Sequence, residues 1–345
     1  MISIEPILQL AAERKASDIH LAVESPPILR INGVLTRIGE DKLSGQDLEQ
    51  LAHSLMNEHQ AKRFEEQGEL DFSYSLPGVG RFRVNTFRQR GSVAIVIRII
   101  PFRIPTPESL GLPPVCVELA KLEKGLVLVT GPTGSGKSTT LASMIDYINQ
   151  TRSKHIVTIE DPIEYLHKHR LSLVNQREIG NDTLSFANAL RAVLRQDPDV
   201  ILVGEMRDLE TISTAVTAAE TGHLVFSTLH TNDATQAIDR MIDVFPPFQQ
   251  QQIRVQLASV LQGVLAQQLL PRQDNQGRVA VFEVLMVTQG ARNLIREGKT
   301  HQLPTVIQTG GKMGMQSMEK GIQDLARQGI ISAALAQEKL QALGR

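Results

Sequence analysis

The sequence is poor in residues that cross-link a chain. It contains one cysteine, Cys116, and no tryptophan among 345 residues. A single cysteine forms neither an internal disulfide nor a cysteine-rich zinc site. The first residues also lack the basic start and the apolar run of a signal peptide. We therefore expect a protein of a reducing compartment whose cores are stabilised by burial alone, with Cys116 as a small apolar filler.

Long apolar runs are also lacking. The longest uncharged stretch near the end, Val255–Pro271, contains four glutamines and falls short of the roughly 20 apolar residues that span a bilayer. Its spacing favours a buried amphipathic helix, with an apolar face made of Leu257, Leu261, Val264, Leu265 and Leu269. These features predict a soluble, cytoplasmic protein without a transmembrane segment.

Neither sign of charge is in excess. Lys and Arg number 36 and Asp and Glu number 37, which gives a formal net charge of −1. A dedicated nucleic-acid binder usually carries a basic patch or stripe, and no basic run stands out here. Nucleic acid is therefore not an expected partner.

The length predicts two domains. Residues 1–103 combine short strands with helical segments, so we expect a small α+β domain with an antiparallel sheet. Asn32-Gly33 is a typical hairpin turn. Helices are expected over residues 4–15 and 48–66. Strands are expected at Ile19–Val23, Ile28–Ile31, Arg81–Phe87 and Val93–Ile100.

The next stretch is rich in proline, which predicts a linker over residues 104–114. Residues 115–345 alternate apolar strands with helices, a pattern typical of an α/β domain with a mainly parallel sheet covered on both faces. The strands are expected at Leu126–Thr130, Ile156–Ile159, Val200–Val203 and Leu224–Thr228. The helices include Lys137–Asn149, Ser185–Arg195 and Leu209–Glu220.

A complete phosphate-binding loop, Gly131–Ser138, follows the first of these strands and opens the first of these helices. The glycines let backbone N–H groups turn around phosphate oxygens, and the helix N-terminus adds positive potential. Lys137 is expected to reach the β- and γ-phosphates, and Ser138 to hold Mg²⁺. A chance match in a flexible turn is the alternative. The expected nucleotide contacts are Thr133, Gly134, Ser135, Gly136, Lys137, Ser138 and Thr139.

Carboxylates follow two more apolar strands. Glu205 ends the strand Val200–Val203 at the sheet edge where ligands bind, so it is placed to polarise the Mg²⁺ shell or the attacking water. Glu160, Asp161 and Glu164 follow the strand Ile156–Ile159, and three acids this close require a nearby cation. A surface glutamate and a solvated acidic turn are the simpler alternatives.

Other polar residues are weaker candidates. His230 ends the strand Leu224–Thr228 and is placed to sense the γ-phosphate. Arg191 and Arg195, four residues apart on one helix, are candidate phosphate contacts. Arg83 and Arg98 lie on strands of the first domain and are candidates to neutralise charge on a γ-phosphate from another domain or subunit. For each of these residues an ordinary structural role is the alternative.

Taken together, the chain resembles the type II/IV secretion ATPase superfamily, whose members power type II secretion and type IV pili. The resemblance lies in an acidic box, Thr158–Glu164, a second carboxylate motif, Leu194–Asp208, and a histidine box, Thr221–Asp233. It implies a RecA-like P-loop domain preceded by a small PAS-like domain. It also implies Mg²⁺-dependent ATP hydrolysis by a homo-hexamer that contacts an inner-membrane pilus platform protein from the cytoplasmic side.

The same resemblance assigns roles. Glu164 would be the general base, Glu205 would support Mg²⁺ and water, and Arg83 and Arg98 would be paired phosphate-sensing arginines. Ala291–Glu297 resembles a C-terminal signature of the retraction ATPases. In that helix Leu294 and Ile295 are expected to pack, and Arg292 and Arg296 to present a charged face. A plain amphipathic helix is the alternative for this segment.

Three functions are consistent with these patterns. The favoured one is a motor that couples ATP hydrolysis to pilus retraction. The second is a secretion ATPase with a regulatory or accessory role in pilus dynamics, or a nucleotide-gated module that binds ATP and hardly turns over. A nearly inactive module would more often have lost one of Lys137, Glu164 and Glu205, and all three are present. A nucleic-acid translocase is disfavoured by the neutral charge and would be supported only by salt-dependent DNA binding.

Overall fold

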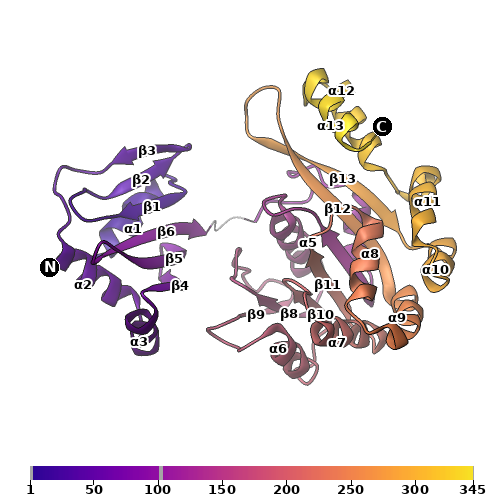
Figure 1. Cartoon of the computed structure of the whole chain (residues 1–345), viewed down its shortest axis with the longest axis horizontal. Helices are drawn as coiled ribbons and strands as arrows, with labels where there is room; N and C mark the ends of the chain where they lie inside the picture. Colours follow the sequence, from indigo (N-terminus) through magenta and orange to yellow (C-terminus); the bar gives the residue numbers. More distant parts are fainter. Residues whose placement is uncertain (1–2, 101–103, 345) are drawn as a thin grey trace. The chain divides into compact units, whose positions relative to one another are not determined.

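The computed structural model describes residues 3–100 and 104–344. The chain divides into two compact units, one of Met1–Arg103 with Glu164–Leu166 and one of Ile104–Ile163 with His167–Arg345. We call them unit 1 and unit 2. The predicted boundary at residue 103 lies outside the described residues. The expected mixture of an α+β part and an α/β part is confirmed (Figure 1).

Unit 1 is built on a six-stranded sheet in the order β3-β2-β1-β6-β5-β4, in which every pairing is antiparallel. Asn32 (φ 49°) and Gly33 (φ 84°) form the tight turn between β2 and β3, as their sequence predicts. The strands are β1 Asp18–Leu21, β2 Ile28–Ile31, β3 Val34–Arg37, β4 Glu69–Leu76, β5 Gly80–Gln89 and β6 Ser92–Ile100.

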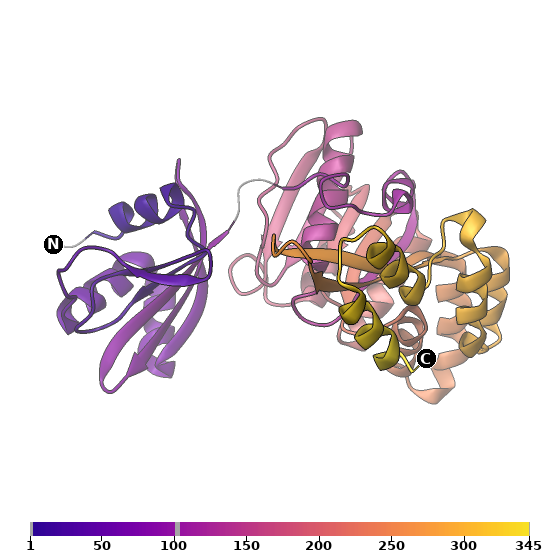
Figure 2. The same cartoon turned by 90° about the horizontal axis from the view of Figure 1, so that it is seen from above.

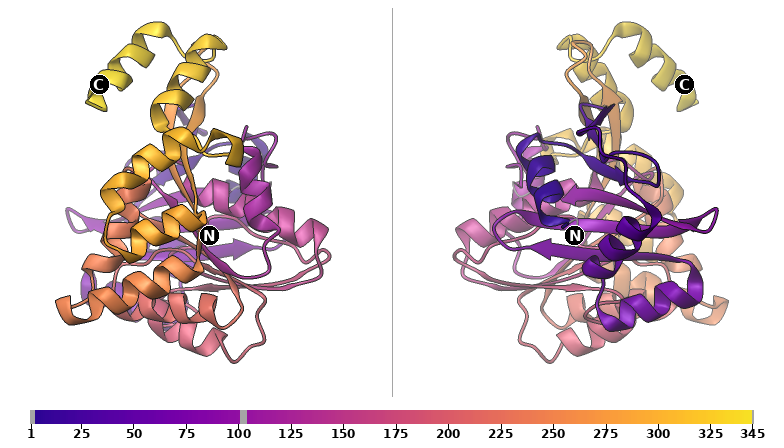
Figure 3. Two further views of the ribbon diagram at one scale, coloured as in Figure 1. Left: turned by 90° about the vertical axis from the view of Figure 1, so that its right-hand side faces the viewer. Right: turned by 90° about the vertical axis from the view of Figure 1, so that its left-hand side faces the viewer.

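Three helices, α1 Glu5–Glu13, α2 Gly45–Leu55 and α3 Glu58–Gln67, share one core with this sheet (Figure 3, right). The predicted single helix over residues 48–66 is wrong. The helix is interrupted because Asn57 starts α3 with a capping box, in which its side chain accepts from the Gln60 N–H while the Gln60 side chain accepts from the Asn57 N–H. Such a box fixes a helix start and favours a break in the middle of a longer apolar pattern.

Unit 2 contains a seven-stranded sheet in the order β13-β12-β7-β11-β10-β8-β9. All neighbours are parallel except β12 and β13. The prediction of a mainly parallel sheet is confirmed. The strands are β7 Gly125–Thr130, β8 His155–Glu160, β9 Leu173–Glu178, β10 Val200–Val203, β11 Leu224–Leu229, β12 Leu261–Pro271 and β13 Arg278–Met286.

Helices cover both faces of this sheet. Alternate residues of β7 show the two layers, since Val127 and Val129 pack in the core that contains α4 and α5, and Leu126 and Leu128 pack in the core on the opposite face. Helices α4 Pro114–Ala120 and α5 Lys137–Thr151 form the first layer (Figure 2). The second is formed by α6 Phe186–Val193, α7 Leu209–Glu220, α8 Ala234–Asp243, α9 Pro247–Val260, α10 Gln289–Arg296 and α11 Leu303–Thr309.

The segment Val255–Pro271 is not the single helix that its spacing predicts. Helix α9 ends at Val260, and β12 begins at Leu261 as a strand between β7 and β13. Because side chains alternate on a strand, Val264 packs on the α9 side of the sheet and Leu265 on the α5 side. A short buried apolar run is compatible with either a helix or a central strand, and here pairing with two neighbours decides for the strand.

The C-terminal segment packs at the β13 edge of the sheet. Helices α12 Met318–Arg327 and α13 Ala333–Ala342 share a small core with Leu270 of β12 and Val281 of β13 (Figures 2 and 3). Gln316 exchanges two backbone hydrogen bonds with Val284, with N···O distances of 2.8 and 3.2 Å. The chain after α11 therefore covers part of the outer edge of β13. None of the helices within residues 3–100 and 104–344 is long and apolar enough to cross a membrane.

Candidate nucleotide site

The phosphate loop occupies the turn between β7 and α5, as the sequence predicts. Its glycines have the backbone torsions that other residues rarely adopt, with φ of 147° at Gly131, 77° at Gly134 and 89° at Gly136. Such torsions let successive backbone N–H groups turn toward one centre and bind an anion. The N-terminus of the 15-residue helix α5 follows directly, so its dipole adds positive potential at this centre.

Lys137 is folded over this loop. Its side chain is buried, and Nζ donates to the carbonyl oxygens of Gly131 at 2.7 Å and Pro132 at 3.2 Å. These carbonyls hold the ammonium at the loop, where charge on bound phosphate would be neutralised. Around it, Ser135 is buried, Gly136, Ser138 and Thr139 are half-buried, and Thr133 and Gly134 are exposed.

Parallel pairing brings the other predicted groups to the same sheet edge. Strands β7, β11, β10 and β8 are consecutive neighbours, and parallel strands end at one edge. The phosphate loop, His230, Glu205 and Glu160 each follow or end one of these strands. Thr130 Oγ1 also accepts from the Thr231 N–H at 3.0 Å, which joins the start of the loop to the histidine box.

Glu205 lies between two cationic or polar partners. Its Oε1 is 2.6 Å from Arg207 Nε and 3.3 Å from His230 Nε2. The structure therefore brings together two residues that the sequence nominated separately. Arg207 was missed in the sequence, although it stands two residues from Glu205 and such spacing places both on one side of an extended segment. His223 lies at the other end of β11, where its Nδ1 is 2.9 Å from the Ala218 carbonyl oxygen.

The acidic residues after β8 differ in their surroundings. Glu160 Oε1 accepts from Thr158 Oγ1 at 2.6 Å and from Gln176 Nε2 at 3.1 Å. Asp161 and Glu164 are exposed. Glu164 is thus accessible to a water molecule, whereas one oxygen of Glu160 is already occupied by neutral donors.

Arg191 lies on α6, whereas Arg195 lies two residues beyond the end of that helix. Arg191 pairs with Glu210 of α7, and Arg195 Nη1 donates to the Arg191 carbonyl oxygen at 3.2 Å. A role in phosphate binding would require the pair between Arg191 and Glu210 to open. That role stays a prediction.

Arg83 and Arg98 are directly opposite each other on β5 and β6 of unit 1. Like charges in that position repel, and each has an acidic partner. Arg83 Nε lies 3.7 Å from Asp71 Oδ1, and Arg98 Nε lies 3.0 Å from Asp18 Oδ1. Burial alone would raise the pKa of Asp18, but hydrogen bonds from Ser17 and Arg98 hold that pKa below its usual value. The two arginines form a pair of positive charges on one face of the sheet.

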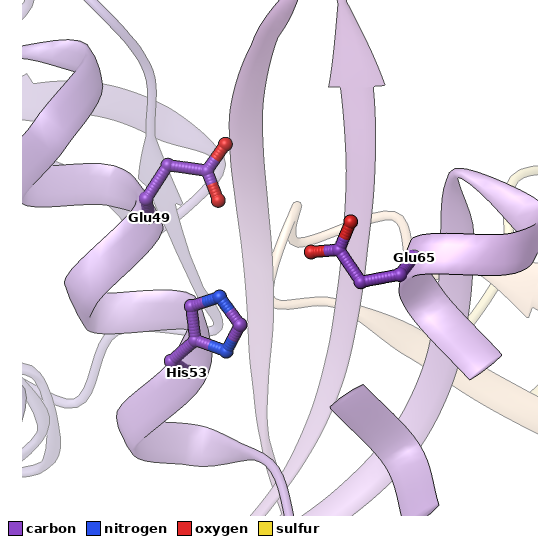
Figure 4. Close-up of side chains that lie close together, drawn as sticks. All are labelled: Glu49, His53 and Glu65. Atoms are coloured by element: carbon purple, nitrogen blue, oxygen red, sulfur yellow. The ribbon is translucent and has the colours of Figure 1, made fainter. Parts of the chain in front are cut away.

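Unit 1 also holds three side chains of the type that bind metals. Glu49 and His53 come from α2 and Glu65 from α3, and one possible ligand atom of each lies within 4.8 Å of those of the other two (Figure 4). Arg88 is 3.2 Å from a Glu49 oxygen and 3.3 Å from a Glu65 oxygen, and its guanidinium stacks over Phe64. Arg88 already supplies the positive charge that these carboxylates require, so we interpret the group as an ion-pair cluster.

Most of the C-terminal signature lies on α10, and its two arginines have different surroundings. Arg292 Nη1 donates to the carbonyl oxygens of Ala258 at 2.6 Å and Ser259 at 2.8 Å, and Arg292 Nη2 donates to Gln262 Oε1 at 3.1 Å. It therefore caps the C-terminal end of α9, and burial lowers the pKa of Arg292. The predicted charged face is wrong for Arg292 and holds for Arg296, which is exposed.

A loop of this geometry, on a mainly parallel sheet with carboxylates at neighbouring strand ends, is the phosphate site of P-loop nucleotide-binding proteins. The family model described as "Type II/IV secretion system protein" matches residues 1–339. The chain therefore belongs to the type II/IV secretion system protein family.

Individual relatives agree with this placement. The type IV pilus retraction ATPase PilT of Pseudomonas aeruginosa is 50% identical over 338 residues, which cover 98% of each chain. The type IV pilus ATPase PilU of the same organism is 43% identical over 331 residues, covering 96% of this chain and 87% of PilU. A crystal structure of the pilus retraction motor PilT with bound ADP is 53% identical and superimposes with a TM-score of 0.91 over 98% of this chain and 97% of that one. The predicted RecA-like fold with a small preceding domain is confirmed.

Proposed function

We propose that this chain is an ATP-hydrolysing motor subunit that powers retraction of type IV pili. The observation that carries the proposal is the 50% identity to PilT, which extends over 98% of both chains and therefore includes the phosphate loop, the carboxylates and the C-terminal signature. A relative of this length and identity supports the same activity and the same partners.

The geometry of the phosphate loop, of Glu205 and of His230, together with the family resemblance for Glu164, supports a division of roles. Lys137 neutralises charge on the β- and γ-phosphates, and the loop N–H groups of Thr133 to Thr139 hold the phosphate oxygens. Glu164, exposed at the acidic turn, removes the proton from the attacking water. Glu205 orients that water, and its contact with His230 lets a change at the γ-phosphate reach the histidine box.

Mg²⁺ fits the same edge of the sheet. The carboxylates after β8 and β10 concentrate negative charge there, and hard oxygen ligands are those that Mg²⁺ prefers. Ser138 would hold the ion directly and Glu205 through water. When bound, Mg²⁺ would neutralise charge on the phosphate oxygens.

We further propose a homo-hexameric ring. Arg83 and Arg98 form a pair of positive charges on unit 1, and this pair suits the γ-phosphate bound by a neighbouring subunit, as an arginine supplied in trans. The ring would act at the cytoplasmic face of the inner membrane against a pilus platform protein, without nucleic acid. Native mass measurement tests the ring, and full activity of a monomer would contradict the shared site.

Deletion of the gene followed by imaging of labelled pili tests the motor proposal. We expect pili that extend and do not retract, with retraction restored by the wild-type chain and not by Lys137→Ala. The 43% identity to PilU supports an accessory role as the second candidate. Retraction that continues at reduced force or frequency after deletion would favour that second candidate and contradict the first.

A further inference from the structure

Gln267, on β12, is a buried polar residue that lies directly against the phosphate loop. Only 2% of its surface is exposed. Its Nε2 donates to the Ser135 carbonyl oxygen at 2.8 Å, and its Oε1 accepts from Thr140 Oγ1 at 2.8 Å. One amide therefore joins the loop to the first turns of α5, and both ends of the amide are used.

The glycines of the loop are packed against the same residue. A Cβ atom at Gly131 would approach the Gln267 carbonyl oxygen to 2.3 Å, and one at Gly136 would approach Gln267 Nε2 to 2.9 Å. No other residue type fits at Gly131, because the obstacle there is backbone. Packing against β12 therefore requires glycine at Gly131, in addition to its torsion, whereas at Gly136 a Cβ atom would displace the Gln267 amide from its position.

We propose that Gln267 is a positioning residue that holds the phosphate loop in its nucleotide-binding shape before nucleotide arrives. The loop is short and rich in glycine, so its torsions alone leave it many conformations. Hydrogen bonds from a central strand select one of them, and a binding site that is already formed avoids the cost of ordering on binding. This inference rests on the loop binding nucleotide phosphate, as proposed above.

The position of β12 gives this contact a second consequence. Ala266 is paired with Thr130, the last residue of β7, so Gln267 stands beside the first residue of the loop. Further along the same strand, Leu270 packs in the core formed with α12 and α13. A single strand therefore contacts both the phosphate loop and the C-terminal helices, with Gln267 as the point of contact at the loop.

The test is Gln267→Met, which keeps the length of the side chain and removes both hydrogen bonds. Two neutral hydrogen bonds together shift a conformational equilibrium by about tenfold. If only about a tenth of the nucleotide-free variant holds the competent loop, the apparent Kd for ADP rises about tenfold. Because saturating ATP restores the loop, KM for ATP should rise by a similar factor while kcat stays within about twofold.

Two further variants make the result specific. Thr140→Val removes one of the two bonds and should raise Kd for ADP less than Gln267→Met does. The double variant should match Gln267→Met alone, because Thr140 acts through Gln267. Gln268→Met changes the next residue, whose side chain points to the other face of the strand, and should leave Kd unchanged.

These measurements distinguish a failure of the Gln267 proposal from a failure of the phosphate-loop assignment. A Gln267→Met variant that melts at a lower temperature but binds ADP with the wild-type Kd would show a purely structural residue and overturn the inference. Lys137→Ala should bind ADP far more weakly in the same assay. Unchanged binding by Lys137→Ala would instead overturn the assignment of the phosphate loop.

Discussion

Replacing Glu283 by glutamine is expected to change how the stability of the protein depends on pH. Glu283, on β13, is largely enclosed, and its Oε1 accepts from the Ala234 N–H at 2.9 Å. Burial raises the pKa of Glu283 to about 7, against hydrogen bonds from the Ala234 and Met318 backbone that lower it. The nearby carboxylates of Asp233 and Glu319 raise it further. A single carboxyl group thus contacts the N-termini of α8 and α12.

The raised pKa of Glu283 determines whether the protein gains or loses stability as the pH rises. The folded state holds the Glu283 proton more tightly than the unfolded state, in which the pKa of a glutamate is near 4.5. The stabilisation is complete below that value and is lost as the pH rises toward 7. The difference between the folded and unfolded pKa values of Glu283 corresponds to about 3 kcal/mol of folding free energy. This is an upper value, because the side chain keeps some contact with water.

Glu283→Gln stays neutral at every pH and keeps the oxygen that accepts from Ala234. We expect it to match the wild type at pH 4 and to be more stable at pH 8 by up to about 3 kcal/mol. For a domain of this size, 3 kcal/mol corresponds to roughly 6–12 °C in Tm, measured by thermal unfolding of the nucleotide-free chain. Glu338→Gln, at an exposed carboxylate, is the control. An equal difference in Tm at both pH values would refute the reasoning.

Three further predictions concern the site and the signature. Lys137→Ala should abolish ATP hydrolysis, measured as phosphate release, while circular dichroism shows an unchanged fold. Glu164→Gln and Glu205→Gln should leave ATP binding nearly intact and slow hydrolysis by ~10²–10⁴-fold; wild-type turnover in Glu164→Gln would place the base elsewhere. Arg292→Ala should lower thermal stability, because α9 loses a cap on its last carbonyls, whereas Arg296→Ala should keep stability and ATPase activity but impair retraction in pilus imaging.

The parts of the site that could be predicted are those encoded by contiguous residues. The loop Gly131–Ser138 stands between an apolar strand and a helix start, so its local sequence predicts both its place in the fold and its chemistry. Glu205 and His230 could be nominated because each follows an apolar strand, and parallel strands end at one edge. Their contact with each other depends on β10 and β11 being neighbours, which the sequence does not state.

The parts that could not be predicted depend on contacts between distant segments. In the sequence Gln267 is only a polar residue in an apolar run. Its contact with the phosphate loop arises because β12 lies beside β7. The strand itself was mistaken for a continuation of α9, because burial on both faces removes the alternation that marks a strand. Arg292 was expected to be exposed, since nothing in its own helix reveals the free carbonyls of Ala258 and Ser259.

The coverage of β13 by Gln316 has a practical consequence for shortened forms of the protein. A chain that ends before this residue would free the N–H and carbonyl groups of Val284 and would remove α12 from the apolar side chain of Val281. An uncovered edge strand of this kind pairs readily with strands of other molecules. Truncations made for expression or crystallisation are therefore expected to aggregate when they stop before Gln316 and to stay dispersed when they retain α12.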